Sequence, residues 1–271
     1  MHPYDIDPSI FFQTELYPHK VWEIEHIQTH ISHIFLTGPY AYKIKKPLNL
    51  GFLDFSTLER RIHFCQEELR LNQRLAPDIY IQVLGLVHEK GAHRLKALDQ
   101  AGGKLIEPVL QMRQMDRTRQ MDQLLSQNQV TQKHIGDLAG LLAGFYAGAE
   151  RSWEAAHFGR PAQIRFNVEE NFNQTADYQG VTVSRERWRS IRDYSLGFLE
   201  DHLDLLAGRV RGGFIVDGHG DLHSGNINLP LAGQPIVFDC IEFNQRFRYQ
   251  DVACDLAFLA MDLDFHGRAD F

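Results

Sequence analysis

The chain has 271 residues, of which 44% are hydrophobic and 23% charged, and its formal net charge at pH 7 is −7. This composition is that of an ordinary globular protein with a sizeable core, and the acidic balance argues against a general nucleic-acid binder, which is usually basic. No apolar run approaches the roughly 20 residues needed to span a bilayer, and residues 1–10 lack the basic start and apolar run of a signal peptide, so we expect a cytoplasmic protein.

Strand signals dominate the first third of the sequence. Short runs of β-branched and aromatic residues predict strands over residues 21–29, 32–36 and 40–45, and then over 79–89 and 105–112. Between these two groups, the segment from Ser56 to Glu59 has the form of a capping box, in which the serine hydroxyl and the glutamate carboxylate satisfy free N–H groups at a helix start. A long helix is therefore predicted from this point until Pro77 stops it.

Helical patterns dominate the rest of the chain. Amphipathic stretches predict helices over residues 131–150, 185–207 and 251–263, with a strand at 214–217 and a hairpin of residues 226–229 and 235–239 between the last two. We therefore expect an α+β, bilobal fold. A strand-rich N-terminal lobe (residues 1–111) contains the long helix, and a helical C-terminal lobe (residues 112–271) contains the small hairpin. Clefts between lobes are favoured places for ligands.

The strongest chemical signal is the segment from His219 to Asn226, which has the spacing HxDxxxxN between two predicted strands. This is the spacing of a kinase catalytic loop, in which the Asp accepts the proton of the attacking hydroxyl and the Asn holds magnesium. Asp221 is therefore the candidate base. Asn226 and Asp239, which ends the returning strand, offer the hard oxygen ligands that Mg²⁺ prefers. His223 lies where a donor can reach the moving phosphoryl group.

A kinase also needs a cation for the α and β phosphates. Residues 40–43, Tyr-Ala-Tyr-Lys, have the form of the V-A-I-K strand, so Lys43 is the candidate, with Lys45 on the same strand face as its rival. Glu68 in the long helix is the candidate partner of that lysine. Glu67 points about 100° away around the helix, so only one of the two can take this role. The plain alternative is that these lysines are solvated edge-strand residues.

Other interpretations of the loop residues are less favoured. His219, His223 and Asp221 would make an incomplete zinc site, because no further nitrogen or sulfur ligand has a suggestive spacing. We expect His219 to brace the loop, and Asp251 and Asp255, one helical turn apart, to cap or brace it from below. The three cysteines form no CxxC pair and are expected to be reduced thiols; they are Cys65, Cys240 and Cys254.

At this point the sequence resembles the aminoglycoside phosphotransferase family, a relative of the choline kinases and protein kinases. The catalytic loop, Asp239 and the segment Asp251–Ala257 carry the resemblance, which extends from about Thr29 to the C-terminus. One bacterial branch of the family is closer still, on three sequence blocks: Tyr42–Pro47, Gly51–Ser56 and Asp239–Asn244. The resemblance implies a protein-kinase-like fold.

The resemblance also implies a reaction. The expected donor is ATP or GTP with Mg²⁺, and the expected acceptor is a small-molecule hydroxyl. In the bacterial branch the kinase-like domain is often followed by a P-loop ATPase domain; no GxxxxGK[ST] occurs in this sequence, so a P-loop ATPase would be a separate partner. Family members usually continue with further helices, and the chain is therefore expected to be a fragment or a short natural form.

One motif departs from the kinase pattern. Between the first two predicted strands, residues 29–33 read Thr-His-Ile-Ser-His in place of GxGxxG. Backbone N–H groups and the Ser32 hydroxyl are the candidate phosphate contacts there, without the glycines that allow close approach.

The leading hypothesis is an ATP-dependent O-phosphotransferase acting on a small hydroxylated molecule, with a cationic acceptor as one option. The alternative is a nucleotide-binding regulatory module that lacks transfer activity and serves a partner P-loop ATPase. Protein phosphorylation is less favoured, because no DFG or APE landmarks occur. Neither a nucleic-acid nor a membrane partner is expected. The segment that follows Asp239 contains candidates for lining the acceptor pocket, for which a structural role is the alternative: Glu242, Asn244 and Arg248.

Overall fold

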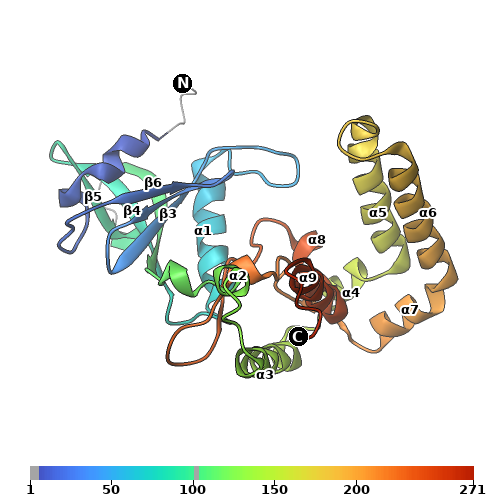
Figure 1. The fold of residues 1–271 in the computed structure, drawn as a ribbon. Helices are drawn as coiled ribbons and strands as arrows, with labels where there is room; N and C mark the ends of the chain where they lie inside the picture. Colours follow the sequence, from blue (N-terminus) through green and yellow to red (C-terminus); the bar gives the residue numbers. More distant parts are fainter. Residues whose placement is uncertain (1–5, 101–103) are drawn as a thin grey trace.

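The computed structural model describes residues 6–100 and 104–271. Its N-terminal part is a six-stranded antiparallel sheet with the order β1-β2-β3-β6-β4-β5, and one long helix, α1, lies against it (Figure 1). The elements are η1 (Pro8–Phe12), η2 (Thr14–Leu16), β1 (Glu25–Gln28), β2 (Ser32–Leu36), β3 (Tyr40–Lys45), α1 (Leu58–Asn72), β4 (Tyr80–Glu89), β5 (Ala92–Ala97), η3 (Leu98–Gln100) and β6 (Lys104–Arg113).

Strand β3 presents different residues to the two faces of the sheet, because side chains alternate along a strand. Tyr42 and Ile44 are buried in an apolar cluster with Phe11 of η1. Lys43 and Lys45 point to the opposite face, where both contact α1. The strand therefore brings two lysines side by side to the same helix.

Helix α1 begins one residue later than the capping-box assignment predicts. Its N-cap is Thr57, whose hydroxyl accepts a hydrogen bond from the Arg60 N–H at 3.3 Å. Ser56 instead donates its hydroxyl to the Asp54 carboxylate. The pairing of Ser56 with Glu59 is therefore wrong, because a nearby carboxylate competes with the helix end for the serine side chain.

The end of α1 is fastened to the C-terminal part of the chain. Asn72 accepts a hydrogen bond from the Cys240 N–H at 2.9 Å. Arg74, just beyond the helix, donates to the carbonyl oxygens of Asp217 at 2.9 Å and Gly218 at 2.8 Å. The two parts of the molecule are thus joined by direct polar contacts with backbone atoms.

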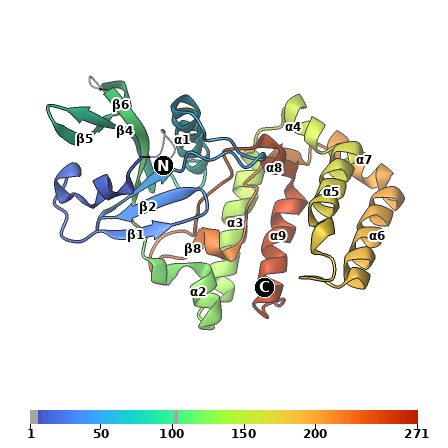
Figure 2. The ribbon, with the colours of Figure 1, turned by 90° about the horizontal axis from the view of Figure 1, so that it is seen from above.

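The C-terminal part is mostly helical. Helices α3 and α9 run side by side in its centre, and α5 and α6 form a pair at the end far from the sheet (Figures 1 and 2). Its elements are η4 (Arg117–Arg119), α2 (Met121–Ser126), α3 (Gln132–Gly148), α4 (Trp153–Phe158), α5 (Pro161–Thr175), η5 (Ala176–Tyr178), α6 (Arg185–Asp201), α7 (Leu203–Arg211), β7 (Ile215–Asp217), η6 (Ser224–Asn226), β8 (Ile227–Asn228), β9 (Ile236–Val237), α8 (Gln245–Arg248), β10 (Tyr249–Asp251) and α9 (Val252–Phe265).

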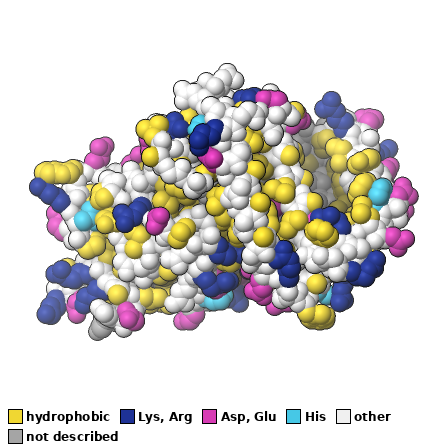
Figure 3. Space-filling model, turned by 90° about the horizontal axis from the view of Figure 1, so that it is seen from below, with side chains coloured by type: hydrophobic (Ala, Val, Ile, Leu, Met, Phe, Trp, Pro, Cys, Tyr) yellow, Lys and Arg dark blue, Asp and Glu magenta, His cyan; other side chains and the backbone are white. Residues whose placement is uncertain are grey.

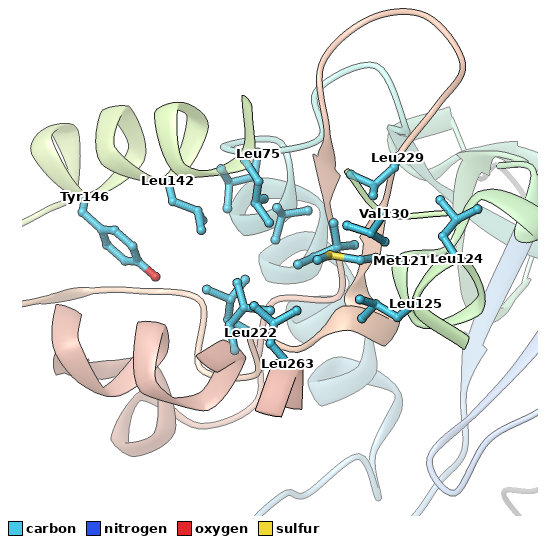
Figure 4. Packing of buried hydrophobic residues seen from close by; sticks show 14 of the residues in the cluster. Leu75, Met121, Leu124, Leu125, Val130, Leu142, Tyr146, Leu222, Leu229 and Leu263 are labelled. Carbon is cyan, nitrogen blue, oxygen red and sulfur yellow. The ribbon is translucent and has the colours of Figure 1, made fainter. Parts of the chain in front are cut away.

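A single apolar core joins these helices to the short strands. Leu142 of α3 and Leu263 of α9 pack with Met121 of α2 and Ile227 of β8. Leu222 points into this cluster and is fully buried (Figure 4). Because Leu222 belongs to the HxDxxxxN segment, the core itself holds that segment in place.

Several elements differ from their sequence-based predictions. Four short elements were not predicted: α2, α4, α8 and β10. Strand β5 and the longer helix α5 were not predicted either; neither has a fully buried residue, so neither shows a clear apolar pattern. The helix predicted over 185–207 is two helices, because His202 has non-helical dihedral angles of −119° and 24°. The predicted α+β arrangement itself is confirmed: a strand-rich part with one long helix, and a helical part with a small hairpin.

On the face drawn in Figure 3, positively charged Lys and Arg side chains are interspersed with negatively charged Asp and Glu side chains. Within residues 6–100 and 104–271, no helix combines the length and the apolar character needed to cross a bilayer.

Candidate active site

The loop between β7 and η6 is shaped by an aspartate beneath it. Both carboxylate oxygens of Asp255 in α9 accept backbone hydrogen bonds, from the His219 N–H at 2.7 Å and the Gly220 N–H at 2.9 Å. Gly220 has a φ of +87°, and a β-carbon there would lie 2.9 Å from the Phe247 carbonyl oxygen. Asp255 thus braces the loop as expected, whereas Asp251 caps α9 instead.

His219 is a structural residue of the loop. Its ring is fully buried; Nε2 lies 3.0 Å from the Phe238 carbonyl oxygen and Nδ1 lies 3.3 Å from the Asp221 N–H. A carbonyl only accepts, so Nε2 carries the proton and Nδ1 accepts. Burial lowers the pKa of His219, which favours this neutral form. Both ring nitrogens are therefore engaged, and no group of three potential metal-ligating His, Cys, Asp or Glu side chains occurs in the part of the chain that the structure describes.

Asp221 lies within reach of two polar side chains of its own loop. The amide nitrogen of Asn226 donates to the Asp221 carboxylate at 3.1 Å and to its carbonyl at 3.0 Å. Nε2 of His223 lies 3.6 Å from the same carboxylate, and this neighbour raises the pKa of His223 above its ordinary value. The Asp221 side chain is 40% exposed, so an incoming molecule can reach it.

Asp239 faces the loop from the end of the hairpin. The Phe238 N–H donates to the Asn226 carbonyl at 3.0 Å, so residues 226 and 239 lie at the same end of the paired strands β8 and β9. Asp239 has a φ of +62° in the left-handed region, which Asp and Asn tolerate better than most residues. Its side chain is 47% exposed and contacts the Lys43 amine at 2.8 Å. The attraction of Lys43 lowers the pKa of Asp239, so the carboxylate stays ionised.

The two lysines of β3 share one glutamate. Lys43 contacts Oε1 of Glu68 at 2.7 Å, and Lys45 contacts Oε2 at 2.5 Å. Burial alone would lower the pKa of Lys43, but the carboxylates of Asp239 and Glu68 outweigh it and raise the pKa well above its usual value. Glu67 points elsewhere and pairs with Arg70 at 2.7 Å. The glutamate that meets the lysines is therefore Glu68, and it meets both.

Among the remaining candidates from the sequence, Ser32, Glu242 and Arg248 are buried, whereas Asn244 is partly exposed. The Ser32 hydroxyl is buried and has no hydrogen-bond partner among the described residues. Glu242 is buried against Lys45, and Arg248 is buried against Asp217. The Asn244 side chain donates to the carbonyl of residue 52 at 3.0 Å. The side chains of Glu242, Asn244 and Arg248 thus make structural contacts.

A group of apolar residues beside the lysine and aspartate was not identified from the sequence. Met112 and Met115, at the end of the sheet, pack in one cluster with Ile236 and Phe238 of the hairpin, and all four are only partly buried. The buried Tyr80 belongs to the same cluster, and its hydroxyl accepts a hydrogen bond from the Asp239 N–H at 3.2 Å. The sequence signal that could have revealed this group was the set of apolar residues near residue 112, where the boundary between the two lobes is predicted.

Comparison with known proteins decides the family. The model of the phosphotransferase enzyme family matches residues 63–271. The chain belongs to this family. The matched region includes Glu68, the HxDxxxxN loop and Asp239, whereas Lys43 lies before it.

Relatives within reach of sequence comparison are uncharacterized proteins. One from Mycobacterium bovis and one from Mycobacterium tuberculosis are each 33% identical to this chain over 243 residues, which is 90% of this chain and 46% of theirs. The chain therefore spans about half the length of these curated relatives.

Among solved structures, the fold is similar to that in the GDP and kanamycin complex of APH(2")-IIia. The TM-score is 0.52 and the sequence identity 13%, and the match covers 97% of this chain and 83% of the other. This similarity confirms the protein-kinase-like fold of the aminoglycoside phosphotransferases.

Proposed function

We propose that the protein transfers the γ-phosphoryl group of ATP to a hydroxyl group of a small molecule. One observation carries the proposal. Contacts link Asp221 to Asn226 in the loop and Asp239 to Lys43 on the sheet, while the hairpin brings Asn226 and Asp239 to the same end. A base, two hard oxygen donors and a cation, which phosphoryl transfer requires, thus face one region.

The residues present fit a magnesium–nucleotide complex. Asn226 uses its amide nitrogen on Asp221, which leaves its oxygen free to serve as a ligand beside the partly exposed Asp239 carboxylate. Lys43 would hold the α and β phosphates, and Glu68 would hold Lys43. When bound, Mg²⁺ would offset phosphate charge and align the γ-phosphoryl group.

In this proposal the nucleoside base binds against apolar side chains. The partly buried Met112 and Met115 lie at the end of the sheet, and Ile236 and Phe238 lie on the hairpin. All four pack against one apolar cluster, which contains Tyr80, whose hydroxyl meets the Asp239 N–H. Cofactor and ligand sites are mostly apolar with a few polar groups that fix orientation. We assign binding of the base to these four side chains. The nucleotide would then lie between residues 1–111, the proposed nucleotide-binding lobe, and residues 112–271, the proposed catalytic and acceptor lobe.

Asp221 would position the acceptor hydroxyl and take its proton. General base catalysis contributes roughly 10² to 10⁴ in rate. His223 would donate a hydrogen bond to the transferred group, since the neighbouring carboxylate favours its protonated form.

The test is phosphate transfer from radiolabelled ATP to a panel of small hydroxylated molecules. Aminoglycosides and GTP belong in the panels, because the structurally similar APH(2")-IIia was solved with GDP and kanamycin. Asp221→Asn should lower transfer by roughly 10² to 10⁴ while Mg-ATP binding, measured by calorimetry, is retained. The isosteric change preserves an acceptor for the Asn226 amide.

Asp193→Asn is the matched control, because among the described residues this exposed α6 carboxylate pairs only with the adjacent Arg192. It should transfer phosphate like the wild type. Undiminished transfer by Asp221→Asn contradicts the assignment of the base. Mg-ATP binding without turnover on any acceptor favours a regulatory module serving a partner P-loop ATPase.

A further inference from the structure

A second lysine is buried next to the proposed phosphate-binding lysine. The Lys45 side chain is 1% exposed, and its amine contacts the carboxylates of Glu68 and Glu242. The amine also lies 4.8 Å from the centre of the Phe55 ring. A lone ammonium in such a dry place is strongly unfavourable, so the two carboxylates are what keeps it charged there.

Lys45 belongs to one continuous chain of charged contacts, which is buried except at the half-exposed Asp239. From Asp239 it runs to Lys43, to Oε1 of Glu68, through Oε2 of Glu68 to Lys45, and on to Glu242. Negative and positive charges alternate along this chain, and each carboxylate oxygen of Glu68 contacts one lysine. Its two ends lie three residues apart in the same segment, so the contacts close a ring through β3, α1 and the segment after β9.

The contacts of Lys45 with Glu68 and Glu242 have a specific role in this ring. A nucleotide and metal ion would draw Lys43 and Asp239 into new contacts. The Lys45–Glu242 contact involves neither of these two residues, so it would still join the sheet to the segment that carries Asp239. Because Lys45 holds Oε2 of Glu68, the other oxygen stays aimed at Lys43. Burial raises the pKa of Glu242 and Lys45 opposes that rise, so each charge depends on the other.

We propose that Lys45 and Glu242 are positioning residues, which fix Glu68 and thereby align Lys43 with Asp239 for the nucleotide. The proposal rests on the proposed function, since it assumes that Lys43 and Asp239 receive Mg-ATP. Neither residue touches the reacting atoms in this account. Both act through Glu68 and through the distance between β3 and the segment after β9.

The experiment compares Mg-ATP binding by calorimetry in matched variants. Lys45→Met/Glu242→Gln removes both charges and retains side-chain volume, so no unpaired buried charge is left. We expect the dissociation constant to rise about tenfold or more, the scale of coupling through a shared network. Arg61→Met/Glu107→Gln is the control, because it removes another buried ion pair between α1 and the sheet that touches neither Lys43 nor Asp239. It should bind like the wild type.

A double-mutant cycle in a Lys43→Met/Glu68→Gln background separates positioning from general stability, because this background leaves no buried Glu68 carboxylate without a cation. If Lys45 and Glu242 act through Glu68 and Lys43, their removal in this background changes the dissociation constant by less than about twofold. Equal binding by the wild type and Lys45→Met/Glu242→Gln overturns the inference, and so does a loss that simply adds to that of Lys43→Met/Glu68→Gln.

Two further outcomes are decisive. If the double variant does not fold by circular dichroism, Glu242→Gln alone replaces it, and wild-type affinity in that folded single variant overturns the inference. If the wild-type protein itself binds no Mg-ATP, the proposed function is overturned, which is a different result from loss of binding in the variants alone.

Discussion

At the scale of single residues, the site depends on a few side chains with unusual surroundings. Asp239 combines a left-handed backbone, a half-exposed carboxylate and a contact with Lys43. Strained backbone of this kind is often found at functional sites. The sequence predicted Asp239 as a metal ligand from its spacing after Asn226, but its backbone conformation follows from tertiary contacts and left no signal in the sequence.

The backbone and the charge of Asp239 can be tested apart. Asn tolerates the left-handed region and Ala does not, so Asp239→Ala should be less stable than Asp239→Asn by about 1–2 kcal/mol in urea unfolding. Both should raise the Mg²⁺ concentration for half-maximal ATP binding by about tenfold to a hundredfold, the range expected for loss of a charged ligand. An unchanged Mg²⁺ requirement in Asp239→Asn would remove this residue from the metal site.

At the scale of elements, α1 is held against the sheet by a buried ion pair. Arg61 donates to both oxygens of Glu107 in β6, at 2.5 and 2.8 Å, and to the Phe55 carbonyl at 2.9 Å. Both side chains are almost fully buried. This pair fixes the first turns of the helix, whereas Glu68, about two turns further on, is held separately by Lys43 and Lys45.

Removing one partner should therefore cost more than removing both. Arg61→Met leaves Glu107 buried without its cation, which typically costs about 3–5 kcal/mol, and Arg61→Met/Glu107→Gln should cost less than the two single changes together. Chemical denaturation of the four proteins measures this cycle. Strict additivity would contradict a direct pair.

The pH dependence of Arg61→Met has a defined sign. Burial raises the pKa of Glu107 even beside Arg61, above the ordinary 4.5, and without the arginine this rise grows. Folding then takes up a proton, so the stability of the variant should be greatest below about pH 4.5 relative to wild type and fall as pH rises through the folded-state pKa. A penalty that is constant with pH would contradict the buried carboxylate.

Much of the arrangement of the elements was predictable, and the failures have identifiable causes. Residues 40–45 form the predicted strand, because their apolar and aromatic pattern is strong. Helix α5 and strand β5 went unpredicted, because elements without buried residues carry no apolar period. The cap of α1 shifted by one residue, because Asp54 takes the Ser56 hydroxyl. Lys45 and Glu242 were each noted, but their contact joins residues 197 positions apart, which spacing cannot reveal.

At the scale of the whole molecule, the candidate site draws residues from both parts of the chain. Lys43 and Glu68 come from the sheet and its helix, whereas Asp221, Asn226 and Asp239 come from the helical part. A ligand held by all of them stabilises the folded state only when both parts are folded, so binding and global stability are linked.

Mg-ATP should therefore raise the unfolding free energy of the whole protein. At a free concentration of about 100 times the dissociation constant the gain is about 2.7 kcal/mol, seen as one transition moving to higher temperature by scanning calorimetry. EDTA should return the transition to its ligand-free position, since the phosphates lose the metal that Asn226 and Asp239 would hold. A shift that survives EDTA would contradict the metal-dependent site.

The contacts at the end of α1 indicate which changes of sequence would break the connection between the two parts of the molecule. Asn72 and Arg74 reach the N–H of residue 240 and the carbonyls of residues 217 and 218. Every amino acid supplies the carbonyl, and every one except proline supplies the N–H. Replacements other than proline at those three positions leave the acceptors and the donor in place, whereas a change at Asn72 or Arg74 removes a whole anchor. The side chains that anchor this joint are thus concentrated at two positions on one side of it. On the opposite side the anchors are backbone groups, although the residues there have other duties: a β-carbon at Gly218 would lie 2.5 Å from Asp255, and Asp217 pairs with Arg248.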